Sequence, residues 1–268
     1  KQFISLNGNG NSLFQGTVNR VKAIVPEENI IIVAHQKLKD NIQRELAEMG
    51  LRNATLLKEP QSNNTAPAIG MAAWYLRAMK SKDEKAIMLV LPSDHLIRPQ
   101  EGFVEVVDRA REAAIAYGLV TFGIKPTYPE TGYGYIRCGE QLNKWIYRVD
   151  EFVEKPKLDL AKKYLADSHY LWNSGMFVFE LRELIAQYHR YLPSLAAGLD
   201  EINYQSFANI GKVYDALESV SIDYGILERS KDVTVIPTDI TWSDVGSWDA
   251  IYKVFPKDAA GNCLHGRV

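Results

Sequence analysis

The sequence is poor in cysteine, and no apolar stretch in it reaches the length of a membrane span. Two cysteines among 268 residues, Cys138 and Cys263, are too far apart for a metal-binding spacing and fit a reducing compartment. No signal peptide is recognisable. An excess of either charge is also lacking, since 31 Lys and Arg face 33 Asp and Glu. We therefore expect a cytoplasmic protein that binds neither nucleic acid nor a membrane.

The first 125 residues alternate short apolar runs with amphipathic stretches of helical spacing. The predicted strands are 29–34, 54–58, 86–91 and 119–124, and the predicted helices are 12–21, 38–49, 65–79 and 102–117. Such alternation predicts βαβ units and a mainly parallel sheet flanked by helices. The apolar run 86–91 reads as a buried central strand of that sheet.

The second half of the chain changes character. Short alternating strands at 134–138 and 147–153 indicate an antiparallel insertion. A helix at 159–167, a strand at 176–179, several helices between 181 and 227, and a strand at 233–237 complete the pattern. We expect one α/β domain over residues 1–268, with a Rossmann-like mixed sheet and a small insertion sized for a sugar.

An acid follows the strand 86–91 directly. Ser93, Asp94 and His95 lie at its carboxyl end, where open α/β sheets bind ligands. A second acid, Asp244, lies between tryptophans in the segment 242–248. Two carboxylates would suit a hard cation such as Mg²⁺ that holds phosphates. The alternatives are that Asp94 caps the next turn and that Asp244 is the N-cap of a helix that begins near residue 246.

Asn64, Thr65 and Ala66 open the helix 65–79, whose first turn has free backbone N–H groups. These groups, with an amide and a hydroxyl beside them, could bind a phosphate or a planar base. The alternative is ordinary helix capping by Asn64 or Thr65.

Three further segments combine polar groups with turn residues. In TGYGYI (131–136) the glycines permit close approach of a ligand and an aromatic ring suits a sugar face; a tight hairpin is the alternative. Glu154 could accept hydrogen bonds from hydroxyls while Lys155 neutralises a phosphate, or the two could form a solvated ion pair. Asn173 could bind the same sugar or mark a turn.

Together these segments, in this order, resemble the mannose-1-phosphate guanylyltransferases, a branch of the sugar-phosphate nucleotidyltransferase family. The resemblance covers nearly the whole chain. It rests on KQF (1–3), NTAPAI (64–69), LPSDH (91–95), ETGYGYI (130–136), FVEKP (152–156), WNSGMF (172–177), SIDY (221–224) and WSDVGSW (242–248).

The resemblance implies a nucleotide-diphospho-sugar transferase fold and the reaction of GTP with mannose 1-phosphate to give GDP-mannose and pyrophosphate. Catalysis would use Mg²⁺ and in-line attack on the α-phosphorus, without a covalent enzyme intermediate. The implied roles are Mg²⁺ binding for Asp94 and Asp244; phosphate contact for Lys1; sugar-phosphate binding for Lys155; hydroxyl contacts for Gly134, Glu154 and Asn173; and nucleotide binding for Asn64, Thr65, Ala66 and Ser93.

The chain departs from the family pattern at both ends. The family's glycine-rich loop, with its phosphate-binding arginine, would directly precede Lys1, and we expect that it has been truncated or omitted. Beyond Val268, family members continue into a β-helix or an isomerase domain. The sequence does not fix the oligomeric state, and the resemblance allows a homodimer.

Two other functions compete with the transferase. A catalytically silent, regulatory homologue would bind a sugar nucleotide, but it would have little need of a pair of acids for a metal. A metal-dependent glycosyltransferase that consumes GDP-mannose would typically carry an Asp-x-Asp motif, and no acid follows Asp94 at that spacing.

Overall fold

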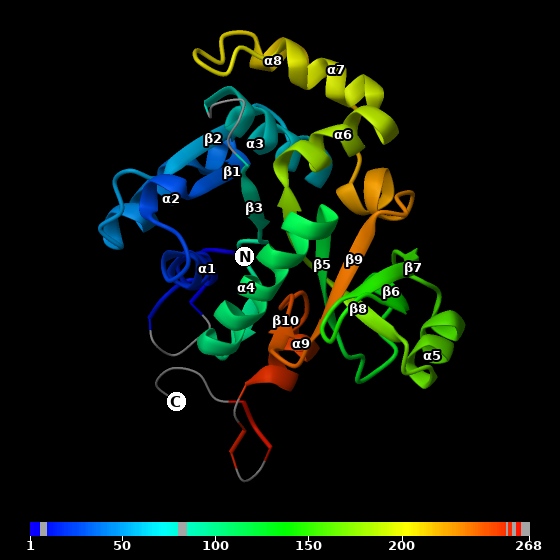
Figure 1. Cartoon of the computed structure of the whole chain (residues 1–268). Helices are drawn as coiled ribbons and strands as arrows, with labels where there is room; N and C mark the ends of the chain where they lie inside the picture. The colour runs from blue at the N-terminus through cyan, green and yellow to red at the C-terminus, as the bar shows by residue number, and fades with distance from the viewer. Residues whose placement is uncertain (6–9, 80–84, 256, 259–260, 264–268) are drawn as a thin grey trace.

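The computed structural model describes residues 1–5, 10–79, 85–255, 257–258 and 261–263. Its centre is a six-stranded sheet in the order β3-β8-β5-β9-β7-β6, in which β6 also pairs with β8 (Figure 1). The strands are β3 (Ile87–Val90), β5 (Leu119–Ile124), β6 (Tyr135–Gln141), β7 (Tyr147–Val153), β8 (Tyr170–Glu180) and β9 (Val233–Thr238).

The prediction of a mainly parallel sheet is wrong for this central sheet. β5 and β9 form its parallel pair, whereas the other described pairs are antiparallel. β3 and β5 do run in the same direction, as their connection through a helix predicted, because each is antiparallel to β8. β8 comes about 50 residues later in the chain and inserts between them. Local periodicity carries no signal for such an insertion.

The strand β3 lies at the end of the sheet order, so the prediction that it is central is also wrong. Its side chains nevertheless pack on both faces. Met88 joins one apolar cluster, whereas Ile87 and Leu89 pack against the other. The apolar run 86–91 therefore indicates that both faces of the strand are covered, and it does not indicate a central position in the sheet.

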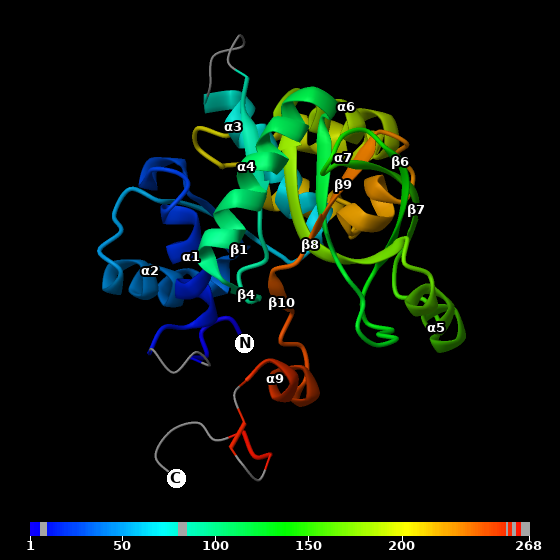
Figure 2. The ribbon, with the colours of Figure 1, turned by 60° about the horizontal axis from the view of Figure 1, so that its bottom comes forward.

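Helices cover both faces of the sheet (Figure 2). One face packs against α3 (Thr65–Met79), α6 (Leu181–Tyr191), α7 (Pro193–Glu201) and α8 (Ile210–Ala216). The other face packs against α4 (Gln100–Tyr117) and α5 (Leu158–Ala166). Among the described helices, none combines the length and the apolar character that crossing a bilayer requires.

A smaller parallel pair flanks this sheet. β1 (Ile31–His35) pairs with β2 (Thr55–Glu59), and α2 (Lys39–Glu48) connects them, as the sequence predicted. α1 (Leu13–Lys22) packs on the same side and closes a third apolar cluster.

Several predicted elements match the structure to the residue, namely α3, β5 and β7. The predicted strand 176–179 is only the end of the eleven-residue β8. Two strands of three residues were missed, β4 (Leu96–Arg98) and β10 (Thr241–Ser243), which pair with each other antiparallel. Three-residue strands are too short to show a period of two.

Glu59, at the end of β2, supplies a test of the buried core. Glu59 is 7% exposed, and its carboxyl accepts a hydrogen bond from the Tyr214 hydroxyl at 3.2 Å. Burial raises the pKa of Glu59 to about 7 from its ordinary 4.5, despite that bond. The folded state therefore holds this proton more tightly than the unfolded state. The resulting stabilisation is complete below pH 4.5 and is lost as the pH rises through 7.

We expect Glu59→Gln to raise the free energy of unfolding relative to wild type by about 3 kcal/mol more at pH 8 than at pH 4.5. Urea unfolding at both pH values measures this difference. The exposed variant Glu112→Gln is the control. An equal effect of Glu59→Gln at both pH values would contradict a buried, protonated carboxyl.

Candidate functional site

The pairing of β4 with β10 brings the two predicted acids to one place. Asp94 and His95 directly precede β4, Asp244 directly follows β10, and Ser243 lies opposite Leu96. Figure 2 shows the N-terminus beside this pair of strands. Lys1 Nζ lies 3.0 Å from Asp94 Oδ2 and donates a hydrogen bond to the backbone oxygen of Asp244. The structure thus joins Lys1, Asp94 and Asp244, which lie far apart in the sequence.

Local contacts hold the Asp244 carboxylate in one orientation. Its Oδ1 accepts hydrogen bonds from the Tyr133 hydroxyl at 2.8 Å and from the Gly246 N–H at 3.0 Å. A Cβ at Gly246 would lie 2.6 Å from Oδ2, so this position needs glycine. Ser247, and not Asp244, is the N-cap of α9 (Trp248–Val254), so the capping alternative for Asp244 is wrong.

The backbone at this corner is strained. Val245 has φ +50°, a left-handed conformation that a β-branched residue rarely adopts. Two predicted site residues, Asn64 at φ +70° and Lys155 at φ +49°, share this feature. Non-glycine residues in this region cost about 1–3 kcal/mol each and cluster at functional sites.

His95 supports the acid pair as a neutral group. Trp242 Nε1 donates a hydrogen bond to His95 Nδ1 at 3.1 Å, which requires that this nitrogen carry no proton. Burial lowers the pKa of His95 to about 4, and the charges of Lys1 and Arg20 add to this effect, although Asp94 and Asp244 oppose it.

Arg20, on α1, was not singled out in the sequence. It is 6% exposed and donates hydrogen bonds to the His95 backbone oxygen at 3.2 Å and to the Thr17 hydroxyl at 2.7 Å. Burial lowers the pKa of its guanidinium to about 10, so the group remains charged at neutral pH. Arg20 thereby fixes the backbone of the loop that carries Asp94.

A second group of polar residues, which we call the amide–carboxylate cluster, consists of Gly134, Glu154, Lys155, Asn173 and Asp223. A Cβ at Gly134 would lie 2.5 Å from Glu154 Oε2 and 3.2 Å from the Asn173 Cβ. Asn173 Nδ2 donates a hydrogen bond to Asp223 Oδ1 at 2.8 Å. Three of the four predicted sugar-side residues therefore border one another, and the fourth, Lys155, contacts Glu154.

Lys155 and Glu154 form the ion pair that the sequence left as an alternative, with Nζ 3.1 Å from Oε1. The pair is asymmetric, because the Glu154 side chain is 12% exposed and that of Lys155 is 59% exposed. The hydrogen bond to Glu154 raises the pKa of Lys155. Its ammonium group is therefore a cation that can reach solvent and an anionic ligand.

Asp223 was quoted in a motif but given no role in the sequence. Burial and the nearby charge of Glu154 raise its pKa to about 6, although hydrogen bonds, including one from Asn173, oppose the rise. A carboxyl of raised pKa in a polar cluster is typical of functional sites.

Tyr133 connects the two groups of residues. Its hydroxyl contacts Asp244, and its backbone oxygen accepts a hydrogen bond from the Lys155 N–H at 3.2 Å. Its ring packs edge-to-face against Trp172 and Trp242, with centroids 5.4 and 5.0 Å away. Burial and the Asp244 carboxylate raise the pKa of Tyr133, so the hydroxyl stays a donor. The ring expected to suit a sugar thus packs between two indoles in this structure.

Three of the residues predicted to bind the nucleotide, Asn64, Thr65 and Ala66, lie at the start of α3, whereas the other two, Ser93 and Asp94, lie in the loop before β4. Asn64 Oδ1 accepts a hydrogen bond from the Thr65 N–H at 2.9 Å, as a local cap would. The Thr65 hydroxyl accepts from the Ile222 N–H at 2.9 Å, next to Asp223. Nucleotide binding here stays a prediction.

Ala66 and Ser93 occupy different environments. Ala66 is fully buried, and its backbone N–H donates to the Val220 oxygen at 3.1 Å. Ser93 is half-buried in the loop before Asp94. Any contact of Ala66 with a base would therefore require rearrangement around α3, whereas Ser93 lies beside the acid pair.

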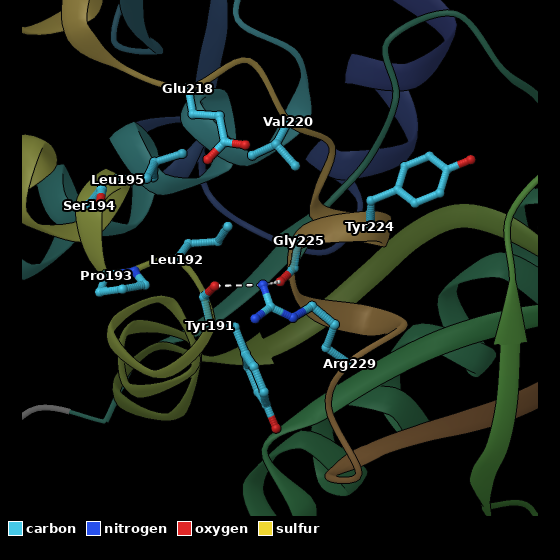
Figure 3. Close-up of a pocket in the computed structure, with 10 residues that line it drawn as sticks. All are labelled: Tyr191, Leu192, Pro193, Ser194, Leu195, Glu218, Val220, Tyr224, Gly225 and Arg229. Carbon is cyan, nitrogen blue, oxygen red and sulfur yellow. Dashed lines mark hydrogen bonds between the residues drawn. The ribbon is translucent and has the colours of Figure 1, made fainter.

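A cavity of about 280 Å³ lies beyond the Asp223 turn (Figure 3). Its lining includes Tyr224 and Gly225, which directly follow Asp223. Arg229 donates hydrogen bonds to the backbone oxygens of Tyr191, at 2.7 Å, and Gly225, at 3.4 Å. No sequence-predicted site residue lines this cavity, so it borders the amide–carboxylate cluster without belonging to it.

Within the described part of the chain, no three His, Cys, Asp or Glu side chains converge as a metal cage. The pair Asp94 and Asp244 could hold only a cation that takes its other ligands from water or a substrate.

Comparison with known proteins assigns the chain to a family. The family model described as nucleotidyl transferase matches residues 1–261. The chain belongs to the nucleotidyl transferase family, which confirms the resemblance noted in the sequence.

Two curated relatives and one solved structure illustrate the similarity. The xanthan biosynthesis protein XanB of Xanthomonas campestris pv. campestris is 39% identical over 274 residues, with 100% of this chain and 57% of the relative covered. The mannose-1-phosphate guanylyltransferase of Salmonella montevideo is 37% identical over 286 residues, with 100% and 58% covered. The chain thus spans little more than half the length of these relatives.

The solved structure is described as a mannose-1-phosphate geranyltransferase from Thermus thermophilus. It has a TM-score of 0.81 and 32% identity, and the match covers 93% of this chain and 70% of that chain. The likeness supports a nucleotidyltransferase-type α/β fold with a mixed sheet.

The neutral state of His95 can be tested by titration. We expect its imidazole to stay neutral from pH 5.5 to 9, because protonation would charge a buried ring and break the bond from Trp242. Histidine-selective NMR shifts measured across this range check the expectation, with the exposed His169 as the reference signal in the same sample. A His95 signal that titrates near pH 6.5 would contradict it.

Proposed function

We propose that this chain carries the site that transfers GMP from GTP to mannose 1-phosphate, giving GDP-mannose and pyrophosphate. The observation that carries the proposal is the β4–β10 pairing, which unites Asp94, Asp244 and Lys1. Tyr133 then joins these groups to the amide–carboxylate cluster. An acid pair for metal-bound phosphates beside hydroxyl-binding groups is what such a transfer needs. The similarity to the mannose-1-phosphate guanylyltransferase of Salmonella montevideo supports the proposal.

The residues present fit Mg²⁺. Magnesium in nucleotide sites is commonly held by one or two carboxylates, and substrate phosphates and water complete its ligands. Asp94 and Asp244 supply two carboxylates, and no third acid is required. When bound there, Mg²⁺ would neutralise charge on the nucleotide phosphates. Lys1, which contacts the Asp94 carboxylate and the backbone oxygen of Asp244, would turn its ammonium group to a phosphate.

The chemistry asks the protein mainly for positioning. An oxygen of the sugar phosphate attacks the α-phosphorus of GTP and forms one new P–O bond. The bond between the α-phosphorus and the bridging oxygen breaks, and pyrophosphate leaves. Lys155 would hold the attacking phosphate, because its exposed ammonium group can exchange Glu154 for a dianion. No proton has to move in this step.

The sugar would lie against Gly134, where a side chain would collide with Glu154. Glu154 would accept hydrogen bonds from hydroxyl groups, and Asn173 would contact an oxygen. Base recognition would fall to the start of α3, where Asn64 and Thr65 lie beside the 220–222 segment. We also propose Ser93 as a contact to the nucleotide, since it precedes Asp94.

The first test is pyrophosphate release from GTP and mannose 1-phosphate, measured on the full-length gene product with and without Mg²⁺. We expect metal-dependent release that falls at least about 100-fold in Asp94→Asn and Asp244→Asn, because each change removes charge from the acid pair. Asp249→Asn, an exposed acid on α9, is the control. Binding of GDP-mannose without release from any nucleotide would overturn the transferase and favour a regulatory binding protein.

A second test concerns Tyr133. Tyr133→Phe removes the hydroxyl that orients Asp244, and partners that orient metal ligands typically contribute 10–100-fold to metal affinity. We expect the Mg²⁺ concentration for half-maximal rate to rise about tenfold. The matched control is Tyr135→Phe, which instead loses a partly buried hydrogen bond of 2.9 Å from the hydroxyl to the Glu130 backbone oxygen. Equal effects of the two variants would contradict the role of Tyr133.

A further inference from the structure

The amide of Asn173 is bonded on three sides. Its Oδ1 accepts from the Gly175 N–H at 3.2 Å and from the Thr121 hydroxyl at 3.2 Å, and its Nδ2 donates to Asp223 at 2.8 Å. Asn173 is 8% exposed and Thr121 is fully buried. These partners come from three different elements, β8, β5 and the turn at Asp223.

The three bonds permit only one orientation of this amide. The Gly175 N–H is a fixed donor, so an oxygen must face it. A flipped amide would set its NH₂ group against that N–H and its oxygen against the Asp223 carboxyl. The Gly175 N–H and the Thr121 hydroxyl approach both lone pairs of Oδ1, and the Thr121 proton is shared with the backbone oxygen of Met176 at 3.3 Å. The hydrogen bonds of the described residues therefore leave one N–H of Asn173 for a ligand, and no acceptor.

A bulge in β8 makes the contact with Thr121. Thr121 pairs with Phe177, and Gly123 pairs with Asn173. These two pairs are two residues apart along β5 but four residues apart along β8. Gly175, at φ +69°, takes up the extra length. The bulge turns the Asn173 side chain toward the Thr121 hydroxyl, whose proton lies between Asn173 Oδ1 at 3.2 Å and the backbone oxygen of Met176 at 3.3 Å.

We infer that Thr121 is a positioning residue for sugar recognition. It holds the Asn173 amide in the orientation that donates a hydrogen bond, so that Asn173 binds a lone pair of one sugar hydroxyl oxygen. Glu154, on the other side of Gly134, accepts a hydrogen bond from a hydroxyl group. A hydroxyl can satisfy both kinds of partner, whereas a protonated ammonium group or a hydrogen at the same carbon cannot. The inference rests on the proposed function and adds to it a residue that never touches the substrate.

The experiment compares KM for mannose 1-phosphate with KM for GTP in Thr121→Val, a change of nearly constant volume. We expect the first KM to rise about tenfold, since one hydrogen bond is worth about 1.4 kcal/mol at most here, and the second to change less than about twofold. Thr121→Ser, which keeps the hydroxyl, is expected to restore both values.

Thr234 offers a matched control. It is also fully buried, lies on the neighbouring β9, and donates its hydroxyl to the Leu119 oxygen at 2.9 Å. Thr234→Val therefore loses a buried hydroxyl bond without touching Asn173, and we expect it to leave both KM values unchanged. If Thr121→Val does not fold, Thr121→Cys, a weaker donor of similar size, takes its place. The expected difference between the changes in the two KM values is then smaller.

A double-mutant cycle gives the sharpest readout. If Thr121 acts through Asn173, then Thr121→Val changes KM for the sugar phosphate less than about twofold in an Asn173→Ala background. An undiminished effect there, or a parallel rise of both KM values in the single variant, would overturn the inference. Absence of pyrophosphate release by the wild-type protein would instead overturn the proposed function, so the two failures are distinguishable.

Discussion

The insertion of β8 between β3 and β5 is the constraint on which the site depends. One half of this strand pairs with β3 and the other half with β6, and β5 follows both halves on the opposite edge. The stretch between the halves is the bulge at Gly175, where a Cβ would contact Pro92 and His95. The interruption in the ladder therefore places Gly175, two residues after Asn173, next to the loop that carries Asp94. A regular strand would continue the backbone hydrogen bonds of the ladder through this interruption.

Strained backbone conformations and charged side chains occur together at the predicted site residues. Asn64, Lys155 and Val245 hold left-handed backbone conformations that ordinary residues avoid, and each is or adjoins a predicted site residue. Such conformations persist only where neighbouring contacts over-determine them. Here the hydrogen bonds of Tyr133 to Asp244 and from the Lys155 N–H provide such contacts. The fold thus includes unfavourable backbone conformations at residues that lie at or next to the charged groups of the site.

Two of the carboxylates in the site form ion pairs. Lys1 lies against Asp94 and Lys155 lies against Glu154, whereas the Asp244 carboxylate accepts hydrogen bonds from the neutral Tyr133 hydroxyl and the Gly246 N–H. Burial keeps His95 neutral and Tyr133 protonated, so neither adds a charge that would disturb the acid pair.

The sequence by itself determined the helices and strands of long, regular pattern, such as α3 and β5, and the residue types at the site. Those follow from local rules, because periodicity, turn residues and chemistry are properties of neighbouring residues. It did not determine the antiparallel course of β8, the three-residue strands β4 and β10, or the contacts of Thr121, Asp223 and Arg20. Only the tertiary structure decided these, because strand insertion, a bulge and a buried hydrogen-bond network depend on residues that are 50 or more positions apart.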